Sequence, residues 1–220
     1  MKISSLALTV LLLLCFSTQA QTFPDDAEIK NGVYSNAFFN FSFAYPKDWV
    51  VPDEALKKRI KERANEESVK SGNSAYMKDA YLLLTVSRQP LGTPSSRLNP
   101  TILVAAEKIS HVPGNPTAKD YLLGYRSVKL QSGLRSSLPE PVPFRVAGLL
   151  FFRDDYAGTV NGASIRQSTF VSFKKGYAIV FTFTGEDQKA VVEMAKAMEM
   201  IVSLGKDGGT GPKKVIISDH

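Results

Sequence analysis

Aromatic and smaller side chains alternate over residues 38–51. The rings at every second position are Phe39, Phe41, Phe43 and Tyr45. Because a strand sends alternate side chains to opposite faces, we expect these rings to share one face of a strand. Pro46 sets its own φ to the value that suits a turn, and Lys47 and Asp48 complete that turn. Trp49, the only tryptophan, follows at once, so the stretch predicts a core-building strand and turn without a reactive group.

Three other stretches have the signals of helices. The first begins after the capping residue Asp53, and the second begins at Thr117, which is spaced from Asp120 as in a capping box. Gly133 is expected to end the second helix. The third helix is predicted over residues 186–204 with one apolar face, which we interpret as core. The residues of that face are Val191, Met194, Ala195, Met198, Ile201 and Val202.

The remaining apolar stretches predict strands. They cover residues 32–34, 81–86, 101–109, 146–156, 165–173 and 177–183. Asn161-Gly162 and Lys174–Gly176 are turn sequences, so the last three strands are expected to form an antiparallel meander. The proline-rich residues 136–143 predict a stiff connection without a domain boundary, because neither side looks self-sufficient.

The N-terminus has the pattern of a secretory signal peptide. Lys2 precedes an apolar run over residues 6–16, and small residues before Gln21 predict cleavage after Ala20. The run is too short for a transmembrane helix, which needs about 20 apolar residues. Leu14 stands where a lipoprotein would need a small residue before Cys15. We therefore expect a secreted or periplasmic protein with no transmembrane segment in the mature chain.

Four segments are expected along the chain. They are the signal peptide 1–20, a flexible lead-in 21–30, a single α+β domain 31–204 and a disordered tail 205–220. Within the tail, the apolar residues 215–217 are the part suited to pairing with a sheet edge or a partner.

Composition excludes several classes of chemistry. Cleavage after Ala20 would remove Cys15, the only cysteine, so we expect neither a disulfide nor a thiolate metal ligand. The net charge of the full chain is +6 at pH 7, and its basic residues are spread out, which favours solubility over nucleic-acid binding. Residues 57–63 are rich in Lys and Arg and suit an anionic partner, but interleaved glutamates favour an ordinary solvated helix face.

No stretch combines reactive groups in the pattern of an active site. His111 and His220 are the only histidines, and His111 lacks a nucleophile motif beside it. Adjacent carboxylates such as Asp154 and Asp155 point to opposite faces of a strand, so they do not converge as a glycosidase pair must. The glycine-rich residues 205–214 miss the spacing of a phosphate-binding loop.

Residues 32–36 and 39–49, followed later by Gly148 and by residues 176–184, resemble the PsbP-like family. The resemblance covers about residues 31–204, and Asp48 stands where the family commonly has glycine. It implies an antiparallel sheet with helices on both sides, an α/β/α sandwich. It also implies a protein that binds or assists other proteins, although a shared fold alone does not establish function.

We therefore expect a secreted, non-catalytic accessory domain whose partner is another protein. The alternative is a small-molecule or lipid-binding protein with a closed apolar cavity between the aromatic face of the sheet and a helix. An enzyme would require His111 to meet a serine and a carboxylate in a cleft. No catalytic, cofactor-binding or metal-binding residue is assigned, and no cofactor is expected.

Overall fold

The computed structural model of the chain describes residues 23–24, 26–70, 80–94, 97–110, 114–160 and 162–204. The predicted signal peptide and the tail 205–220 lie outside these residues, as do His111 and His220. The described strands are β1 (Ala27–Lys30), β2 (Val33–Asn36), β3 (Phe41–Ala44), β4 (Ala80–Ser87), β5 (Thr101–Lys108), β6 (Leu134–Ser136), β7 (Val142–Val146), β8 (Leu149–Val160), β9 (Ala163–Lys174) and β10 (Tyr177–Gly185). The helices are α1 (Glu54–Lys70), α3 (Ala118–Gln131) and α4 (Gln188–Ala195), and the 3-10 helix η1 (Lys196–Met200) follows α4.

The described strands form two antiparallel sheets. The larger sheet has the order β4-β5-β10-β9-β8-β6, and β7 also pairs with β8. The smaller sheet has the order β1-β2-β3. Strands β8, β9 and β10 are consecutive neighbours, so the predicted meander is confirmed, as is the antiparallel α+β class. The turn between β9 and β10 contains Lys175 at φ 52° and Gly176 at φ 79°, as expected for a two-residue hairpin turn.

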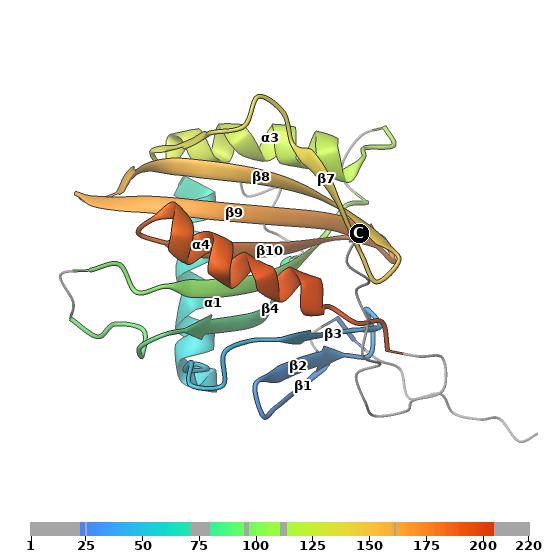
Figure 1. Ribbon diagram of the computed structural model, residues 1–220, viewed down its shortest axis with the longest axis horizontal. Coiled ribbons are helices and arrows are strands. Elements are labelled where there is room, and N and C mark those ends of the chain that lie inside the picture. Colours follow the sequence, from blue (N-terminus) through green and yellow to red (C-terminus); the bar gives the residue numbers. More distant parts are fainter. Residues whose placement is uncertain are drawn as a thin grey trace, which may run out of the picture.

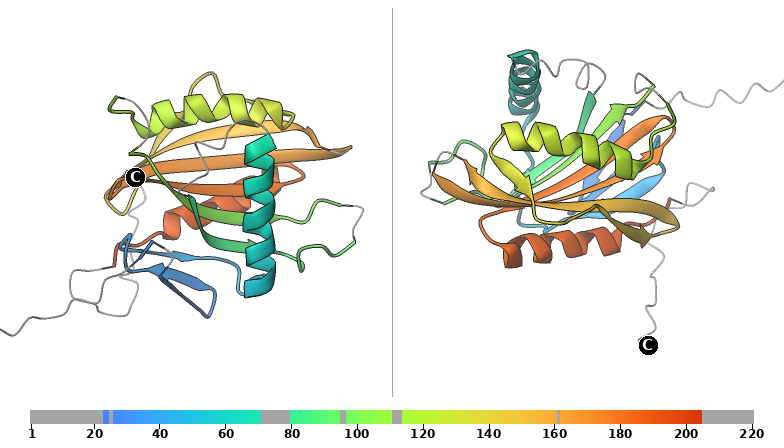
Figure 2. Two further views of the ribbon diagram at one scale, coloured as in Figure 1. Left: turned by 180° about the vertical axis from the view of Figure 1, so that it is seen from behind. Right: turned by 90° about the horizontal axis from the view of Figure 1, so that it is seen from above.

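Helices α3 and α4 pack against opposite faces of the large sheet, as the view from above in Figure 2 shows. Leu122 of α3 packs with Val171 and Val180 on one face. On the other face, α4 and β3 pack on the larger core (Figure 1). The two faces carry different side chains, because successive residues of β9 and β10 point to opposite sides of the sheet.

Aromatic rings fill the larger core. Phe181 of β10 lies 5.7 Å from Phe41 and 5.4 Å from Phe43, measured between ring centroids. Trp49 is also buried in this core, and its backbone N–H donates to Pro46 O, which confirms the turn. The predicted role of this stretch in building the core is therefore confirmed.

The strand within the aromatic stretch is shorter than its alternation predicts. Only Phe41–Ala44 is strand, because Asn40 has φ 51° and turns the chain. Phe39 precedes that turn, yet it is fully buried and lies 5.5 Å from the ring of Tyr177. The rings are therefore buried together even though the backbone that carries them is not one continuous strand.

The predicted helix over 186–204 is wrong in its length. It is α-helical only over Gln188–Ala195, tightens to η1, and then becomes extended. Val202 exchanges two backbone hydrogen bonds with Ser42 of β3, which compete with helical hydrogen bonds at this point. The buried stripe is confirmed for five of its six residues, whereas Val202 is half-buried and lies beyond the helix; the five in the core are Val191, Met194, Ala195, Met198 and Ile201.

Three other predicted segments have different boundaries in the structure. The strand predicted over 146–156 is two strands, β7 and β8, because Ala147 and Gly148 both have positive φ and form a turn. The lead-in 21–30 contains β1, and the predicted connection 136–143 overlaps the end of β6 and the start of β7, which leaves 137–141 as the connection. These short strands carry little hydrophobic periodicity, so pairing with a longer neighbour defines them.

The helix starts agree with the sequence. Asp53 Oδ1 accepts a hydrogen bond from Leu56 N at the start of α1. Thr117 and Asp120 form both hydrogen bonds of the predicted capping box, and Gly133 follows the end of α3 with φ 78°. These predictions of helix ends are confirmed because each capping interaction involves residues close together in the chain.

Replacing Gly158 of β8 by alanine is expected to destabilise the protein by about 1–3 kcal/mol. A Cβ added there would lie 2.1 Å from the backbone oxygen of Gly133, so the connection between α3 and β6 would have to move. Gly124, inside α3, is the matched control because an added Cβ meets nothing within 4 Å. Gly124→Ala is expected to stabilise by about 0.5–1 kcal/mol through helix propensity. Urea unfolding of both variants measures the difference, and equal effects would contradict the close approach.

Candidate functional site

Four chain segments meet at one end of the large sheet and form a groove. They are the turn after β3, the end of β4, the start of β5 and the start of α4. The main hollow has a volume of about 520 Å³, and a second hollow of about 340 Å³ adjoins it. We call the two together the Trp49 groove, and its members come from residues 46–49, 88–89, 97–100, 186–190 and 193–194.

The Trp49 groove has an apolar floor and a charged rim. Trp49 and Met194 line it and are buried, and Pro100 beside them is half-buried. The exposed charged side chains of the main hollow are Asp48, Arg88, Asp187, Lys189 and Glu193. An apolar centre with a rim of both charge signs is the usual anatomy of a protein-binding surface.

Hydrogen bonds hold the walls of the groove in place. Arg88 N donates to Pro100 O, which ties the end of β4 to the start of β5. Leu98 N donates to Glu186 Oε1 at 2.7 Å, which ties the same segment to the end of β10. Asp187 Oδ1 accepts from Ala190 N and so caps α4. The groove therefore has a preformed shape, which lowers the entropic cost of binding.

The groove offers contacts suited to binding, with no hydroxyl, thiol or imidazole among the side chains assigned to its two hollows. Two of its acidic members, Glu186 and Asp187, accept hydrogen bonds from backbone N–H groups. Arg88 lines both hollows, so its guanidinium is placed to bind a carboxylate or a backbone carbonyl of a partner.

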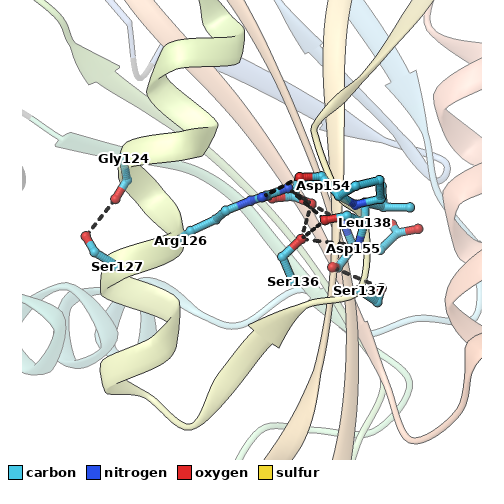
Figure 3. A network of polar contacts seen from close by, with 9 residues as sticks. Gly124, Arg126, Ser127, Ser136, Ser137, Leu138, Asp154 and Asp155 are labelled. Carbon is cyan, nitrogen blue, oxygen red and sulfur yellow. Dashed lines mark hydrogen bonds and ion pairs between the residues drawn. The ribbon is translucent and has the colours of Figure 1, made fainter.

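A second polar cluster lies between α3 and the sheet (Figure 3). Arg126 of α3 donates from Nε to Asp154 Oδ2 at 2.7 Å and from Nη2 to Asp154 Oδ1 at 3.1 Å. Ser136 Oγ donates to the same carboxylate at 2.7 Å. Arg126 also donates to the carbonyls of Leu138 and Pro139, and the hydrogen bond to Asp154 raises the pKa of Arg126. Asp154 is fully buried and saturated with donors, so this cluster joins α3 to β6 and β8 and is structural.

Asp154 and Asp155 lie on opposite faces of β8, as predicted. Asp155 binds Arg153 through both carboxylate oxygens, at 2.8 and 2.7 Å, and accepts from Ser168 Oγ at 2.6 Å. Each carboxylate is engaged in its own ion pair. The two do not converge on one point.

Buried Glu107 pairs with half-buried Tyr121 beside the small core under α3. Tyr121 Oη donates to Glu107 Oε2 at 2.5 Å, and Glu107 is buried. Burial raises the pKa of the Glu107 carboxyl to about 7, although the hydrogen bond from Tyr121 lowers it. Burial and the neighbouring Glu107 in turn raise the pKa of the Tyr121 phenol. The pair therefore makes stability depend on pH near neutrality.

The other residues singled out in the sequence lie either outside the described residues or on a solvated helix face. His111, His220, Asp25 and residues 205–217 lie outside the described residues. In the basic helix α1, Lys57 pairs with Glu54 at 2.6 Å and Lys58 approaches Glu62 at 3.9 Å, in agreement with a solvated helix face. Across the described ranges, no group of three His, Cys, Asp or Glu side chains is placed to hold a metal ion. None of the helices in the described ranges has the length and apolar character needed to span a membrane.

Aromatic rings of the sheet pack against one another on the face where the small-molecule alternative expects a closed cavity. Phe170 and Phe183 lie 5.8 Å apart, and Phe151 lies 5.9 Å from Phe181. The Trp49 groove lies instead at the end of the sheet. The sequence analysis did not indicate this groove, because no motif marks Arg88 or Pro100 and only their convergence with Trp49 in the fold brings the site together.

Comparisons with known proteins give structural likenesses only. No family model matches the chain, and no curated protein matches it significantly. The cyanobacterial PsbP (CyanoP) of Synechocystis matches with a TM-score of 0.45 and 13% identity over 80% of this chain and 94% of its own. LpqN, involved in cell envelope biogenesis of Mycobacterium tuberculosis, matches with a TM-score of 0.39 and 14% identity over 74% and 82%. A protein of unknown function from Pseudomonas aeruginosa matches with a TM-score of 0.39 and 10% identity over 55% and 80%. Likenesses this low say nothing about activity or partners.

Proposed function

We propose that the chain is a secreted, non-catalytic accessory protein of the PsbP-like type, with an α/β/α arrangement and a signal peptide cleaved after Ala20. Its partner is another protein, and the contact surface is the Trp49 groove. The observation that carries this proposal is the preformed groove, with buried Trp49 and Met194 at its floor and charges of both signs at its rim. Trp and Arg dominate the energetics of protein interfaces, and Trp49 and Arg88 both line this groove.

A small molecule is the alternative occupant, because about 520 Å³ falls within the size range of small-ligand sites. Native mass spectrometry of the purified protein separates the two: a co-purified ligand of defined mass in the groove would favour the alternative. The open, mixed-charge rim favours a protein surface.

Reversing the charge of Arg88 is expected to weaken capture of the partner. Residues 21–220 serve as bait against envelope and culture-medium extracts, and captured proteins are quantified by mass spectrometry. A partner recovered in near-stoichiometric amount with the unaltered chain should drop about tenfold or more with Arg88→Glu, since arginine anchors at interfaces contribute about 2 kcal/mol.

Arg145→Glu is the matched control, because Arg145 is exposed on β7 and lines neither hollow of the groove. It should capture the partner as well as the unaltered chain does. Failure of the unaltered chain to capture any partner would overturn the proposal, and equal loss with both variants would place the contact outside the groove.

A further inference from the structure

The end strands of the two described sheets border one groove. β4 is the end strand of the large sheet, and β1 is the end strand of the small one. Ala27 and Ile29 of β1 and residues 81–85 of β4 border the same hollow of about 380 Å³. The N-terminal part of α1 closes it with Glu54, Lys57 and Lys58. We call this hollow the β4-edge groove.

The path of the chain explains why the edge of β4 is open. Val50 and Ser87 exchange two backbone hydrogen bonds at this edge, at 2.8 and 3.1 Å. Continuing that antiparallel pairing would set Pro52 opposite Thr85, but proline has no N–H to donate. The chain instead enters α1 after the cap Asp53. The edge of β4 beyond Val86 is therefore left without a strand in the described part of the chain.

The β4-edge groove has the chemistry of a strand-binding site. An open edge presents N–H and C=O groups that an extended backbone satisfies. Thr85 is buried, and its Oγ1 has no hydrogen-bond partner among the described residues. Partly exposed Ile29, Tyr81 and Leu82 provide apolar contacts.

The lysines beside the β4-edge groove favour an extended partner with acidic side chains. Lys58 lines the groove with its side chain 79% exposed, and its approach to Glu62 is long, at 3.9 Å. Lys57 is tied to Glu54 at 2.6 Å. These lysines attract carboxylates, and the net positive charge of the chain disfavours a second copy in the same place. A bulge between Leu82 and Leu84 interrupts the regular ladder and further limits indiscriminate pairing.

We propose that the β4-edge groove binds an extended segment of a partner protein in which acidic and apolar side chains alternate. The segment adds a strand to the edge of β4, places its apolar side chains near Ile29 and Leu82, and sets its carboxylates toward Lys57 and Lys58. This site is separate from the Trp49 groove, because the two have no lining residue in common. This proposal goes beyond the proposed function, and either proposal can be overturned without affecting the other.

A short acetylated peptide that alternates glutamate and valine is the probe, and a lysine–valine peptide is its charge-reversed counterpart. Hydrogen exchange of the full chain should slow at edge amides within Ala80–Thr85 when the glutamate peptide is added, with no slowing by the lysine peptide. Lys57→Glu/Lys58→Glu should weaken binding of the glutamate peptide about tenfold, in line with two partly screened rim charges. Glu54→Lys should strengthen it, because it removes the acidic side chain of the groove.

Lys189→Glu is the matched control, since Lys189 is exposed and lines the Trp49 groove instead. It should leave peptide binding unchanged. Absence of any slowed exchange in β4 would overturn the proposal, as would equal binding of the two peptides. Protection of β4 that needs no peptide and rises with protein concentration would identify a second copy as the occupant. Protection lost on deletion of residues 205–220 would identify the chain's own tail, and either result would also overturn the proposal.

Discussion

Replacing Arg126 by alanine is expected to lower the free energy of unfolding by about 3 kcal/mol, the lower end of the usual cost of removing one partner of a buried ion pair, because Asp154 is fully buried but Arg126 only partly so. The carboxylate of Asp154 has no exposed surface, and Arg126 supplies two of its hydrogen bonds. Without the guanidinium, a buried negative charge would lose two of its donors and keep those of Ser136 Oγ and the N–H of Asp155. Urea unfolding at neutral pH measures the loss.

A control on the same helix separates a buried pair from an exposed one. Lys119 of α3 is paired with Glu140, and both side chains are substantially exposed. Lys119→Ala should therefore cost only about 0–1 kcal/mol. Replacing both Arg126 and Asp154 by apolar residues of similar size should restore much of the stability, because no charge is then left unpaired. An Arg126→Ala variant as stable as Lys119→Ala would contradict this account of the cluster.

Replacing Glu107 by glutamine is expected to stabilise the protein at pH 8 by about 3 kcal/mol and to change little at pH 4.5. The pKa of Glu107 is about 7 in the folded protein, above the ordinary value of 4.5. Between these values the folded state binds more protons than the unfolded state, so stability falls as pH rises through this window. Above pH 7, folding must bury a carboxylate, and glutamine removes that cost while retaining an oxygen for Tyr121.

Urea unfolding of the protein and of Glu107→Gln between pH 4.5 and 8 measures this effect. The two stabilities should converge at the acidic end and diverge toward pH 8. Glu193→Gln provides the control, since Glu193 is an exposed residue of α4 paired with Lys196 at the surface. Tyr121→Phe should steepen the pH dependence, because the hydrogen bond that lowers the pKa of Glu107 is lost. Parallel pH profiles for the protein and Glu107→Gln would contradict the raised pKa.

Only one wall of each proposed binding surface was visible in the sequence. Trp49 stood out as the only tryptophan, and it was interpreted as a core residue. It is buried in the core, but it also lines the groove. The lysines of α1 were noted as a possible anion-binding face, and Lys57 and Lys58 do border a groove. In neither case did the sequence indicate the opposite wall, because Arg88 and Ile29 come from other parts of the chain.

The sequence by itself determined the local features of this protein. The capping box of Thr117 and Asp120, the hairpin turn before Tyr177 and the burial of the aromatic stretch all depend on interactions between near neighbours or on hydrophobicity. Only the tertiary structure decided the end of the last helix, where Val202 pairs with Ser42, more than 150 residues earlier. It likewise decided the pairing of Arg126 with Asp154, the convergence of four segments at the Trp49 groove and the open edge of β4. These features depend on which distant strands become neighbours, and that is settled by packing of the whole sheet rather than by any short stretch of residues.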